Sequence, residues 1–409
     1  MRAVLTSPSV TVAVAGVEFG WGSAGKLSAV LSALRERASV PLRFVGLASG
    51  IGRSPLAGHP VERWYDLPDA ADEVALTVGE IARTWDVRAA VVVLDGVVTK
   101  ALEAAGVPCV FVDSLPFLWS EADLPALPLE ATAYCAQRYA APPSGSHGVL
   151  GHVRALHWVE AVVDGRTRHG GRPPAEPGKP YRTALVSLGG LRAPRLADWT
   201  AYPRLVVPAA LAALAAYGVE EAHVAGNLPE DMAARFLGRS RSAAPRHTTA
   251  GPLAHGDFLD RLRTCDVLVA SPGLTTLLEA GGLGVPTVCL PPQNLSQILN
   301  ARMHGAAVGP GLRVTWPEDV FTEDEVLALR GQGEDRVLER IYGGIAAAAG
   351  APPRARRTSD ALGEGVVAAL RRSADGAGWG GLTTAVGTGG AAQVADELLA
   401  ILRRATAPA

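Results

Sequence analysis

The sequence predicts an α/β protein made of two similar halves, each a doubly wound parallel sheet with helices on both faces. In the first half, short apolar runs of strand length alternate with stretches that carry apolar residues at helical spacing. Residues 140–181 break this rhythm with segments rich in Pro and Gly, after which the alternation restarts. Regular alternation of strand and helix is typical of a parallel sheet, so two alternating stretches predict two such sheets.

Several strands and helices are expected in the first half. The strand runs are short, rich in β-branched residues and bounded by turn residues, as buried parallel strands are. The expected strands are 11–16, 42–48, 89–95 and 107–113, and the expected helices are 23–37, 69–85 and 99–106.

The second half repeats the pattern and is followed by a different C-terminal segment. Its expected strands are 182–190, 220–227, 266–273 and 285–292, and its expected helices are 207–218, 255–265, 274–284 and 295–304. A glycine-rich segment, 376–390, and a helix over 391–405 follow. Because 409 residues are enough for two cores, we expect domains 1–180 and 181–375, with residues 376–409 packing back toward the first domain.

The composition describes a compact globular protein, with 48% hydrophobic and 19% charged residues. A formal net charge of −2 gives no field that would gather nucleic acid or anionic lipid. No run of about 18 uninterrupted apolar residues is present, and the N-terminus carries no export signal. We therefore expect a cytoplasmic protein, a monomer or a homodimer, without nucleic-acid or membrane partners.

The cysteines predict neither a disulfide nor a metal site. Cys109, Cys135, Cys265 and Cys289 lie far apart, without a C-x-x-C pair or a neighbouring His at ligand spacing. Most of them lie in or beside apolar runs, where thiols are usually buried and unreactive. We expect no metal and no cofactor.

A glycine-rich stretch near the N-terminus, GWGSAGKL, differs by one residue from a phosphate-binding P-loop. Gly20, Gly25 and Lys26 fit that motif, but Leu27 occupies the place of the hydroxyl that binds magnesium. The strand that ends at Asp95 would supply the second carboxylate that such a site needs. The stretch is therefore either an altered P-loop or a glycine-rich turn with backbone amides at a helix N-terminus. The missing hydroxyl favours the turn.

Polar residues also gather where a strand of the second half turns into a helix. Pro272 and Gly273 allow a tight turn directly after Ser271. Thr275 and Thr276 then place hydroxyls and backbone amides at the positive end of the helix, where a diphosphate would be held.

A carboxylate and a cluster of amides follow this turn. Glu279 lies further along the same helix, where a carboxylate can accept both hydroxyls of a ribose. Gln293, Asn294, Gln297 and Asn300 crowd the start of the next helix, and Asn294 has the alternative role of a helix cap. An amide both donates and accepts hydrogen bonds, which suits a ligand covered in hydroxyls.

These residues resemble the nucleotide-sugar domain of GT-B glycosyltransferases, in the lineage of the cell-wall N-acetylglucosaminyltransferase and the plant and macrolide glycosyltransferases. The resemblance extends over residues 182–310 and includes the turn at 187–190. The pattern is carried by Ser271, Gly273, Thr276, Glu279, Gly284, Pro286, Gln297 and Asn300-Ala301.

The resemblance implies a GT-B fold, in which two Rossmann-like domains face each other across a cleft. Residues 1–180 would bind the acceptor, and residues 181–375 would bind a UDP-sugar that serves as co-substrate rather than cofactor. Gly189, Gly190 and Asn227 would join the donor site.

The first-half segments GVEFGWGSAGK and VDSLPFLW look most like cytosylglucuronate synthases of nucleoside-antibiotic pathways and their relatives. This narrower resemblance implies inverting transfer of a sugar, with glucuronate as one candidate, to cytosine or a similar small acceptor. The aromatic residues of these segments could stack on a flat ring or pack in a core. The expected acceptor residues are Gly20, Trp21, Gly22, Ser23, Phe117 and Trp119.

The first-half loop lacks the His that the cell-wall enzyme and many plant-type enzymes carry. Transfer still needs a group that accepts a proton, and a positioned carboxylate can do so. Glu18 and Asp113 are the candidates, because both follow parallel strands, at whose carboxyl ends ligands bind. Each has the alternative of a turn or cap residue. Two rival functions are a P-loop kinase or NTPase, and a catalytically silent GT-B homologue that binds nucleotide sugar and assists a partner.

Overall fold

The computed structural model describes residues 9–140, 147–168, 180–190, 199–239, 244–332, 334–376 and 378–406. The chain folds into two compact units, and the first of them is assembled from separate parts of the sequence. The first unit contains Met1–Glu18, Ser23–Gly165 and Gly387–Ala409, and the second contains Phe19–Gly22 and Arg166–Val386.

The first unit is built on a seven-stranded sheet with the order β3-β2-β1-β4-β5-β6-β7. Every neighbouring pair is parallel. The strand order reverses between β1 and β4. Doubly wound folds bind ligands at the carboxyl ends of the strands on either side of such a reversal. The strands are Val10–Gly16 (β1), Leu42–Ala48 (β2), Val61–Tyr65 (β3), Val87–Val93 (β4), Cys109–Asp113 (β5), Ala133–Gln137 (β6) and Leu156–Val159 (β7).

Helices cover both faces of this sheet because successive strand residues point to opposite sides. Val12 and Val14 pack in one apolar cluster with α1 (Trp21–Arg37). Ala13 and Ala15 pack in another cluster, with residues of α2 (Ala71–Thr84) and α3 (Gly96–Ala104).

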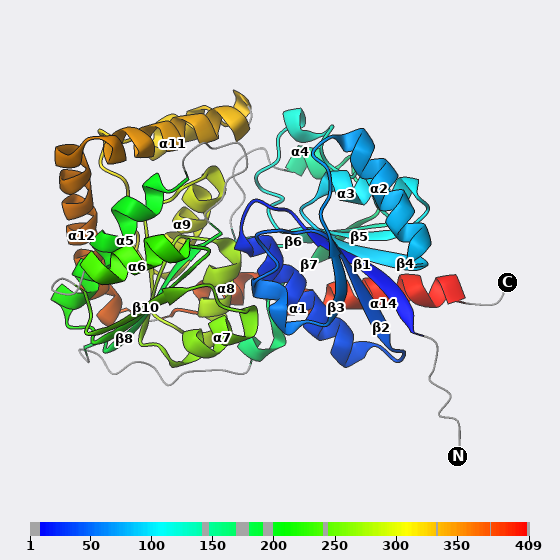
Figure 1. Ribbon diagram of the computed structural model, residues 1–409, viewed down its shortest axis with the longest axis horizontal. Helices are drawn as coiled ribbons and strands as arrows, with labels where there is room; N and C mark the ends of the chain where they lie inside the picture. Colours follow the sequence, from blue (N-terminus) through cyan, green and yellow to red (C-terminus); the bar gives the residue numbers. More distant parts are fainter. Residues whose placement is uncertain are drawn as a thin grey trace, which may run out of the picture. The chain divides into compact units, whose positions relative to one another are not determined.

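The last helix of the chain completes the first unit. α14 (Gly390–Thr406) packs against β4 and β5, and Figure 1 shows this red helix beside the blue and cyan strands. Its residues Val394 and Leu398 are fully buried in the same cluster as α1. The closing helix is therefore part of the core of the first unit.

The second unit has a five-stranded parallel sheet with the order β10-β9-β8-β11-β12. Its order reverses between β8 and β11, as the first sheet does between β1 and β4. The strands are Thr183–Gly189 (β8), Glu221–Gly226 (β9), His247–Gly251 (β10), Val267–Ala270 (β11) and Thr287–Cys289 (β12).

Helices also cover both faces of the second sheet. One face packs against α7 and α8, and α5 and α12 contact β8 and β12. The helices of this unit are α5 (Ala201–Tyr217), α6 (Glu230–Arg239), α7 (His255–Thr264), α8 (Leu274–Leu283), α9 (Leu295–Val308), α10 (Glu323–Ala328), α11 (Glu334–Gly350), α12 (Pro352–Ala374) and α13 (Gly381–Val386). The shorter helices of the chain are η1 (Pro55–Gly58), η2 (Glu121–Asp123), α4 (His147–Leu150), η3 (Gly165–Arg168) and η4 (Arg330–Gln332).

The predicted class of two doubly wound parallel sheets is confirmed. The sequence prediction left out β3, β7 and β10, which are edge strands, as well as β6 beside β7. All four cysteines are buried, and the burial of Cys109, Cys265 and Cys289 agrees with the apolar runs in which they lie.

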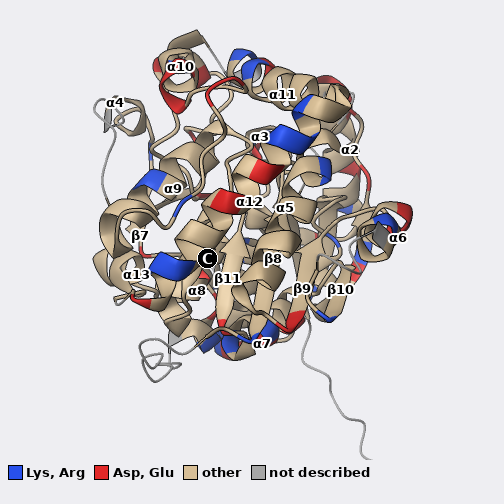
Figure 2. Ribbon diagram, turned by 90° about the vertical axis from the view of Figure 1, so that its left-hand side faces the viewer, with Lys and Arg blue, Asp and Glu red and all other residues tan. Residues whose placement is uncertain are grey.

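Charged residues of both signs are interspersed on the face of the molecule seen in Figure 2. This mixture agrees with the small net charge of −2. Within the described part of the chain, no helix has the length and apolar character that a membrane span requires.

Candidate functional site

Several predicted donor residues lie at the ends of β8 and β11, the two strands between which the second sheet reverses its order. Gly189 ends β8 with a φ of +66°, a left-handed conformation that glycine adopts without strain. Ser271, Pro272 and Gly273 connect β11 to α8. These residues therefore lie at the carboxyl ends of the central strands, where open α/β sheets bind ligands.

The N-terminus of α8 has no side-chain cap. Its N-cap residue, Gly273, is extended, with φ −69° and ψ 130°, and makes no capping hydrogen bond. The first amides of a helix have no intrahelical partner, so those of Thr275 and Thr276 point out at the positive end of the helix dipole. The Thr275 hydroxyl donates to the carbonyl of Gly22, at 3.1 Å, within the second unit. The arrangement suits a phosphate group.

The turn before α8 is held by a tyrosine that the sequence analysis did not select. Tyr202 of α5 is fully buried, and its hydroxyl donates to the carbonyl of Pro291 at 2.8 Å. The Ser271 hydroxyl lies 2.8 Å from the hydroxyl oxygen of Tyr202. Ser271 is therefore bound within the protein and shapes the turn.

The predicted amides form a buried network. Asn294 caps α9, where its Oδ1 accepts the backbone N–H of Gln297 at 2.9 Å, so the alternative role as a cap is confirmed. Gln293 donates its backbone N–H to Gln297 Oε1 at 3.0 Å and its Nε2 to the Leu188 carbonyl at 3.3 Å. Tyr342 of α11, a second residue that sequence analysis missed, donates to Gln293 Oε1 at 3.3 Å. These contacts fix the start of α9.

Two amide groups keep hydrogen-bonding capacity. Asn300 donates its Nδ2 to the Pro272 carbonyl at 3.0 Å, and its buried Oδ1 has no partner among the described residues. Gln297 Nε2 also makes no hydrogen bond within the described part of the chain. Both groups belong to α9, beside the turn that precedes α8.

Glu279, the predicted ribose ligand, is almost completely buried. Its side chain is 2% exposed, and its Oε1 lies 2.7 Å from Nε2 of His255, whose side chain is 5% exposed. The sequence analysis did not select His255, the first residue of α7. Its position at the start of the helix that precedes the predicted strand 266–273 was the available signal.

In the first unit, Glu18 lies exposed two residues beyond β1. Its Oε1 accepts the backbone N–H of Gly50 at 2.5 Å. The preceding Ser49 has a left-handed φ of +64° and is held by its hydroxyl, which accepts the N–H of Gly16 at 2.7 Å. This strained, tightly bonded turn at the end of β2 positions the Glu18 carboxylate.

Asp95 lies beyond β4 at the position that corresponds to Glu18 beyond β1. Gly16 is paired with Val93 in the parallel register, so Glu18 and Asp95 each lie two residues beyond a paired position. Asp95 caps α3 by accepting the N–H of Val98 at 3.0 Å. Burial raises the pKa of Asp95, and the charge of Glu18 adds to that increase.

Asp113, the other predicted base, is fully buried at the end of β5. Its Oδ2 accepts hydrogen bonds from the Tyr134 hydroxyl and from Trp119 Nε1, both at 2.7 Å, and its Oδ1 accepts the N–H of Leu115 at 2.9 Å. Burial raises the pKa of Asp113 to about 6, although these donors oppose the increase. The contacts favour a structural role, because the carboxylate ties the following loop to β6.

The predicted acceptor residues do not form one cluster. Phe117 is fully buried and packs edge-on against Tyr139, with ring centroids 5.5 Å apart, which favours packing over stacking on a ligand. Trp119 is partly exposed, but its indole N–H is bonded to Asp113. Ser23 is buried, and its hydroxyl donates to the carbonyl of Val17 at 2.8 Å.

The other predicted acceptor residues lie in the second unit, in the segment that precedes and begins α1. Gly20 and Trp21 lie so close to Gly190 that a Cβ on Gly190 would come within 2.6 Å of the Trp21 nitrogen. Gly22 accepts the Thr275 hydroxyl described above. Asn227 follows β9 in the same unit.

The stretch that resembles a P-loop is helical. α1 begins at Trp21, so Gly25 and Lys26 lie inside the helix rather than in a loop around a phosphate. Lys26 is buried, and its Nζ donates to Gln137 Oε1 at 2.7 Å. This geometry contradicts the interpretation as an altered P-loop, because the lysine points into the core of the first unit. The glycine-rich turn favoured by the sequence is shorter than expected, because α1 begins at Trp21 rather than at residue 23.

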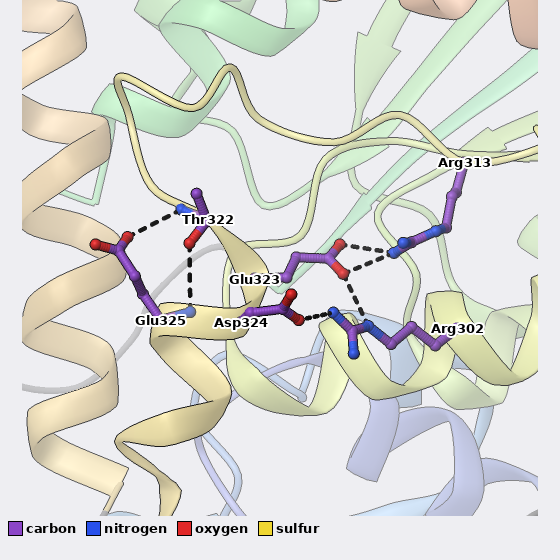
Figure 3. Close-up of polar contacts among 6 residues, drawn as sticks. All are labelled: Arg302, Arg313, Thr322, Glu323, Asp324 and Glu325. Carbon is purple, nitrogen blue, oxygen red and sulfur yellow. Dashed lines mark hydrogen bonds and ion pairs between the residues drawn. The ribbon is translucent and has the colours of Figure 1, made fainter.

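An ionic cluster links the middle of α9 to the start of α10 (Figure 3). Glu323 of α10 accepts from Arg302 of α9 at 2.9 Å and from Arg313 at 2.7 and 2.8 Å. Arg302 also donates to Asp324 at 2.8 Å. Thr322 and Glu325 form a capping box at the start of α10. Since α9 carries Gln297 and Asn300, the cluster helps to fix these amides.

Comparison with known proteins identifies the fold. No protein-family model matches the chain, and no curated protein matches it. A solved structure from Listeria monocytogenes, assigned as a UDP-N-acetylglucosamine 2-epimerase, has a TM-score of 0.50 and 12% identity, covering 90% of this chain and 95% of its own. A UDP-glucosyltransferase from Polygonum tinctorium has a TM-score of 0.50 and 14% identity, covering 97% of this chain and 99% of its own.

The chain has the GT-B fold. This confirms the fold that the resemblance of residues 182–310 to glycosyltransferases implies. In this GT-B chain, the donor residues predicted around the α8 turn lie together in the second unit, and Glu18 lies at the order reversal of the first.

The second unit of this GT-B chain also contains a cavity of about 1060 Å³ between α5, α6 and α12. Its walls include Ala213, Phe236 and Val367, with Arg235 and Arg371 among the charged residues around it. None of the predicted site residues lines it. The cavity is therefore separate from the residues around α8 that the sequence predicts to bind the donor.

We expect two buried histidines to make the second unit of this GT-B chain less stable in acid. Burial lowers the pKa of His304 to about 4, and that of His223 to about 4 with a contribution from Arg261. Histidine in the unfolded chain binds its proton near pH 6.5, so unfolding is favoured as the pH falls from about 6.5 to 4. We expect a loss of about 3 kcal/mol in the free energy of unfolding for each histidine.

Chemical unfolding of the second unit across this pH range tests the expectation. His304→Leu should remove about half of the pH dependence. His247→Leu, which changes an exposed histidine of β10, serves as the control. An unchanged pH dependence in His304→Leu would show that His304 does not titrate in this way.

Proposed function

We propose that this chain is an inverting glycosyltransferase that uses a UDP-sugar donor. The observation that carries the proposal is the uncapped N-terminus of α8, with the buried carboxylate of Glu279 further along the same helix. The amides of Thr275 and Thr276 would bind the diphosphate, and Glu279 would accept the ribose hydroxyls. Gly189, Gly190 and Asn227 belong to the same proposed donor site.

The amides that keep hydrogen-bonding capacity would bind the sugar. Asn300 Oδ1 is a buried acceptor without a partner in the described structure, so a hydroxyl donor would remove the cost of leaving it unpaired. Gln297 Nε2 would donate to another oxygen of the sugar.

Glu18 is the better of the two proposed bases, because it is exposed while Asp113 is enclosed by its donors. The acceptor would lose its proton to the Glu18 carboxylate as its nitrogen or oxygen forms a bond to the anomeric carbon. The bond from that carbon to UDP would break, and the positive end of α8 would stabilise the negative charge on the leaving diphosphate. Displacement from the opposite face inverts the anomeric centre.

The finer proposal names the acceptor as cytosine or a similar pyrimidine, with glucuronate as one candidate sugar, in the synthesis of a nucleoside natural product. It rests on the resemblance of the first-half segments GVEFGWGSAGK and VDSLPFLW to cytosylglucuronate synthases. A pyrimidine N–H is more acidic than a sugar hydroxyl, which agrees with a carboxylate base in place of His.

Release of UDP from a panel of UDP-sugars, with and without pyrimidine acceptors, tests the reaction. Release that depends on an acceptor supports glycosyl transfer. Isomerisation of UDP-N-acetylglucosamine without an acceptor would favour the epimerase activity named for the Listeria relative. Binding of UDP-sugar without turnover would favour the catalytically silent homologue.

Glu279→Ala provides a direct test of the donor site. Loss of charge-assisted hydrogen bonds, each worth about 1.5–3 kcal/mol, should weaken UDP binding at least about tenfold. Calorimetric titration with UDP measures this, and Glu36→Ala, an exposed glutamate of α1, is the control. Unchanged UDP affinity in a folded Glu279→Ala protein would remove Glu279 from the site.

A further inference from the structure

The buried pair of Glu279 and His255 links two helices of the second unit. His255 is the first residue of α7, and Glu279 lies in the middle of α8. Phe258 and Leu259 of α7 share an apolar cluster with Ala280 and Leu283 of α8. The His255–Glu279 hydrogen bond, 2.7 Å long, is therefore set between two packed helices.

A carboxylate that is 2% exposed needs a compensating partner. A buried polar group that is left without a hydrogen-bond partner lowers the stability of the fold. His255 Nε2 supplies the N–H that Glu279 Oε1 accepts. This contact restricts the rotation of the Glu279 side chain.

The pair leaves hydrogen-bonding capacity on Glu279 for a ligand with two hydroxyls. A carboxylate has about four lone-pair sites on its two oxygens, and His255 occupies one of them. Glu279 Oε2 makes no hydrogen bond with any residue in the described parts of the chain. The remaining sites can accept two neighbouring O–H groups, as a ribose presents them.

We infer that His255 is a positioning residue for the donor ribose. It holds the Glu279 side chain in one orientation, so that the carboxylate selects nucleotides with vicinal hydroxyls. The inference rests on the proposed function, since it assigns a role within the same donor site. It predicts that His255 contributes to UDP affinity only when the ribose hydroxyls are present.

The test compares two substitutions that place a side-chain amide differently. In His255→Gln the amide nitrogen can take the place of Nε2, whereas in His255→Asn it lies near the position of Nδ1 and does not reach Glu279. Binding of UDP and of 2′,3′-dideoxy-UDP is measured by calorimetry for both variants, for His255→Leu and for Glu279→Ala.

We expect His255→Asn and His255→Leu to weaken UDP binding about tenfold and to change 2′,3′-dideoxy-UDP binding less than about twofold. His255→Gln should stay within about threefold of the parent for both nucleotides. Adding His255→Leu to Glu279→Ala should cause no further loss, because the two residues act through one contact.

Three outcomes would overturn the inference: equal weakening of both nucleotides, unchanged UDP affinity in His255→Asn, or additive losses in the double variant. If the parent protein binds no UDP at all, the proposed function fails instead, so the two failures are distinguishable. If His255→Leu does not fold, the comparison of His255→Gln with His255→Asn still decides the question.

Discussion

Replacing Asp113 with alanine is expected to lower the free energy of unfolding of the first unit by about 3–5 kcal/mol, because three hydrogen-bond donors would lose their buried, charged acceptor. Those donors are the Tyr134 hydroxyl, Trp119 Nε1 and the backbone N–H of Leu115. Chemical unfolding, monitored through hydrogen exchange of the β5 and β6 amides, measures the change in the stability of this unit. Glu121→Ala, at an exposed position in the following loop, should change little.

The pH dependence provides a second sign of the same role. Since burial raises the pKa of Asp113 to about 6, the folded unit binds a proton more tightly than the unfolded chain does. The unit should therefore lose about 3 kcal/mol of stability as the pH rises from about 4 to 6, and Asp113→Asn should abolish this change. This direction is opposite to that expected for His304 and His223. A stable but inactive Asp113→Ala protein would instead restore Asp113 as the base.

Glu18→Gln is expected to reduce turnover by about 100- to 10,000-fold while UDP affinity stays the same. The amide keeps the size of the side chain and can still accept the N–H of Gly50, but it cannot take a proton from an acceptor. Single-turnover kinetics with saturating donor measure the chemical step. Glu36→Gln, at the exposed end of α1, is the matched control.

A result within about threefold of the parent would exclude Glu18 as the base. Two explanations would then remain, and the acceptor separates them. If acceptors with a less acidic N–H or O–H still react equally fast, another group of the protein takes the proton. If the rate falls steeply as the pKa of the acceptor N–H or O–H rises, the acceptor loses its proton without a base from the protein.

Much of the fold could be predicted from the sequence because its central strands are buried on both faces. The run at 42–48 coincides with β2, and the run at 11–16 lacks only the first residue of β1. β3 and β10 could not be predicted in this way, since edge strands are covered on fewer sides and carry polar residues such as Glu62 and Thr248.

The tight turn before α8 was predictable from the sequence because Ser271, Gly273 and Thr275 lie within a few residues of one another. Contacts between distant segments were not predictable. Asp113 has the sequence surroundings of a base at a strand end, and only folding brings Tyr134, 21 residues away, to its carboxylate. His255 and Glu279 are likewise 24 residues apart, and neither residue type alone indicates a pair.

The position of α14 determines the order in which the protein can be completed during its synthesis. All of Arg166–Val386 leaves the ribosome before α14 does, so the second unit can fold while the first still lacks its last helix. Until then, the sheet surface that Val394 and Leu398 cover is open to water. The first unit therefore begins before the second along the chain and is completed after it.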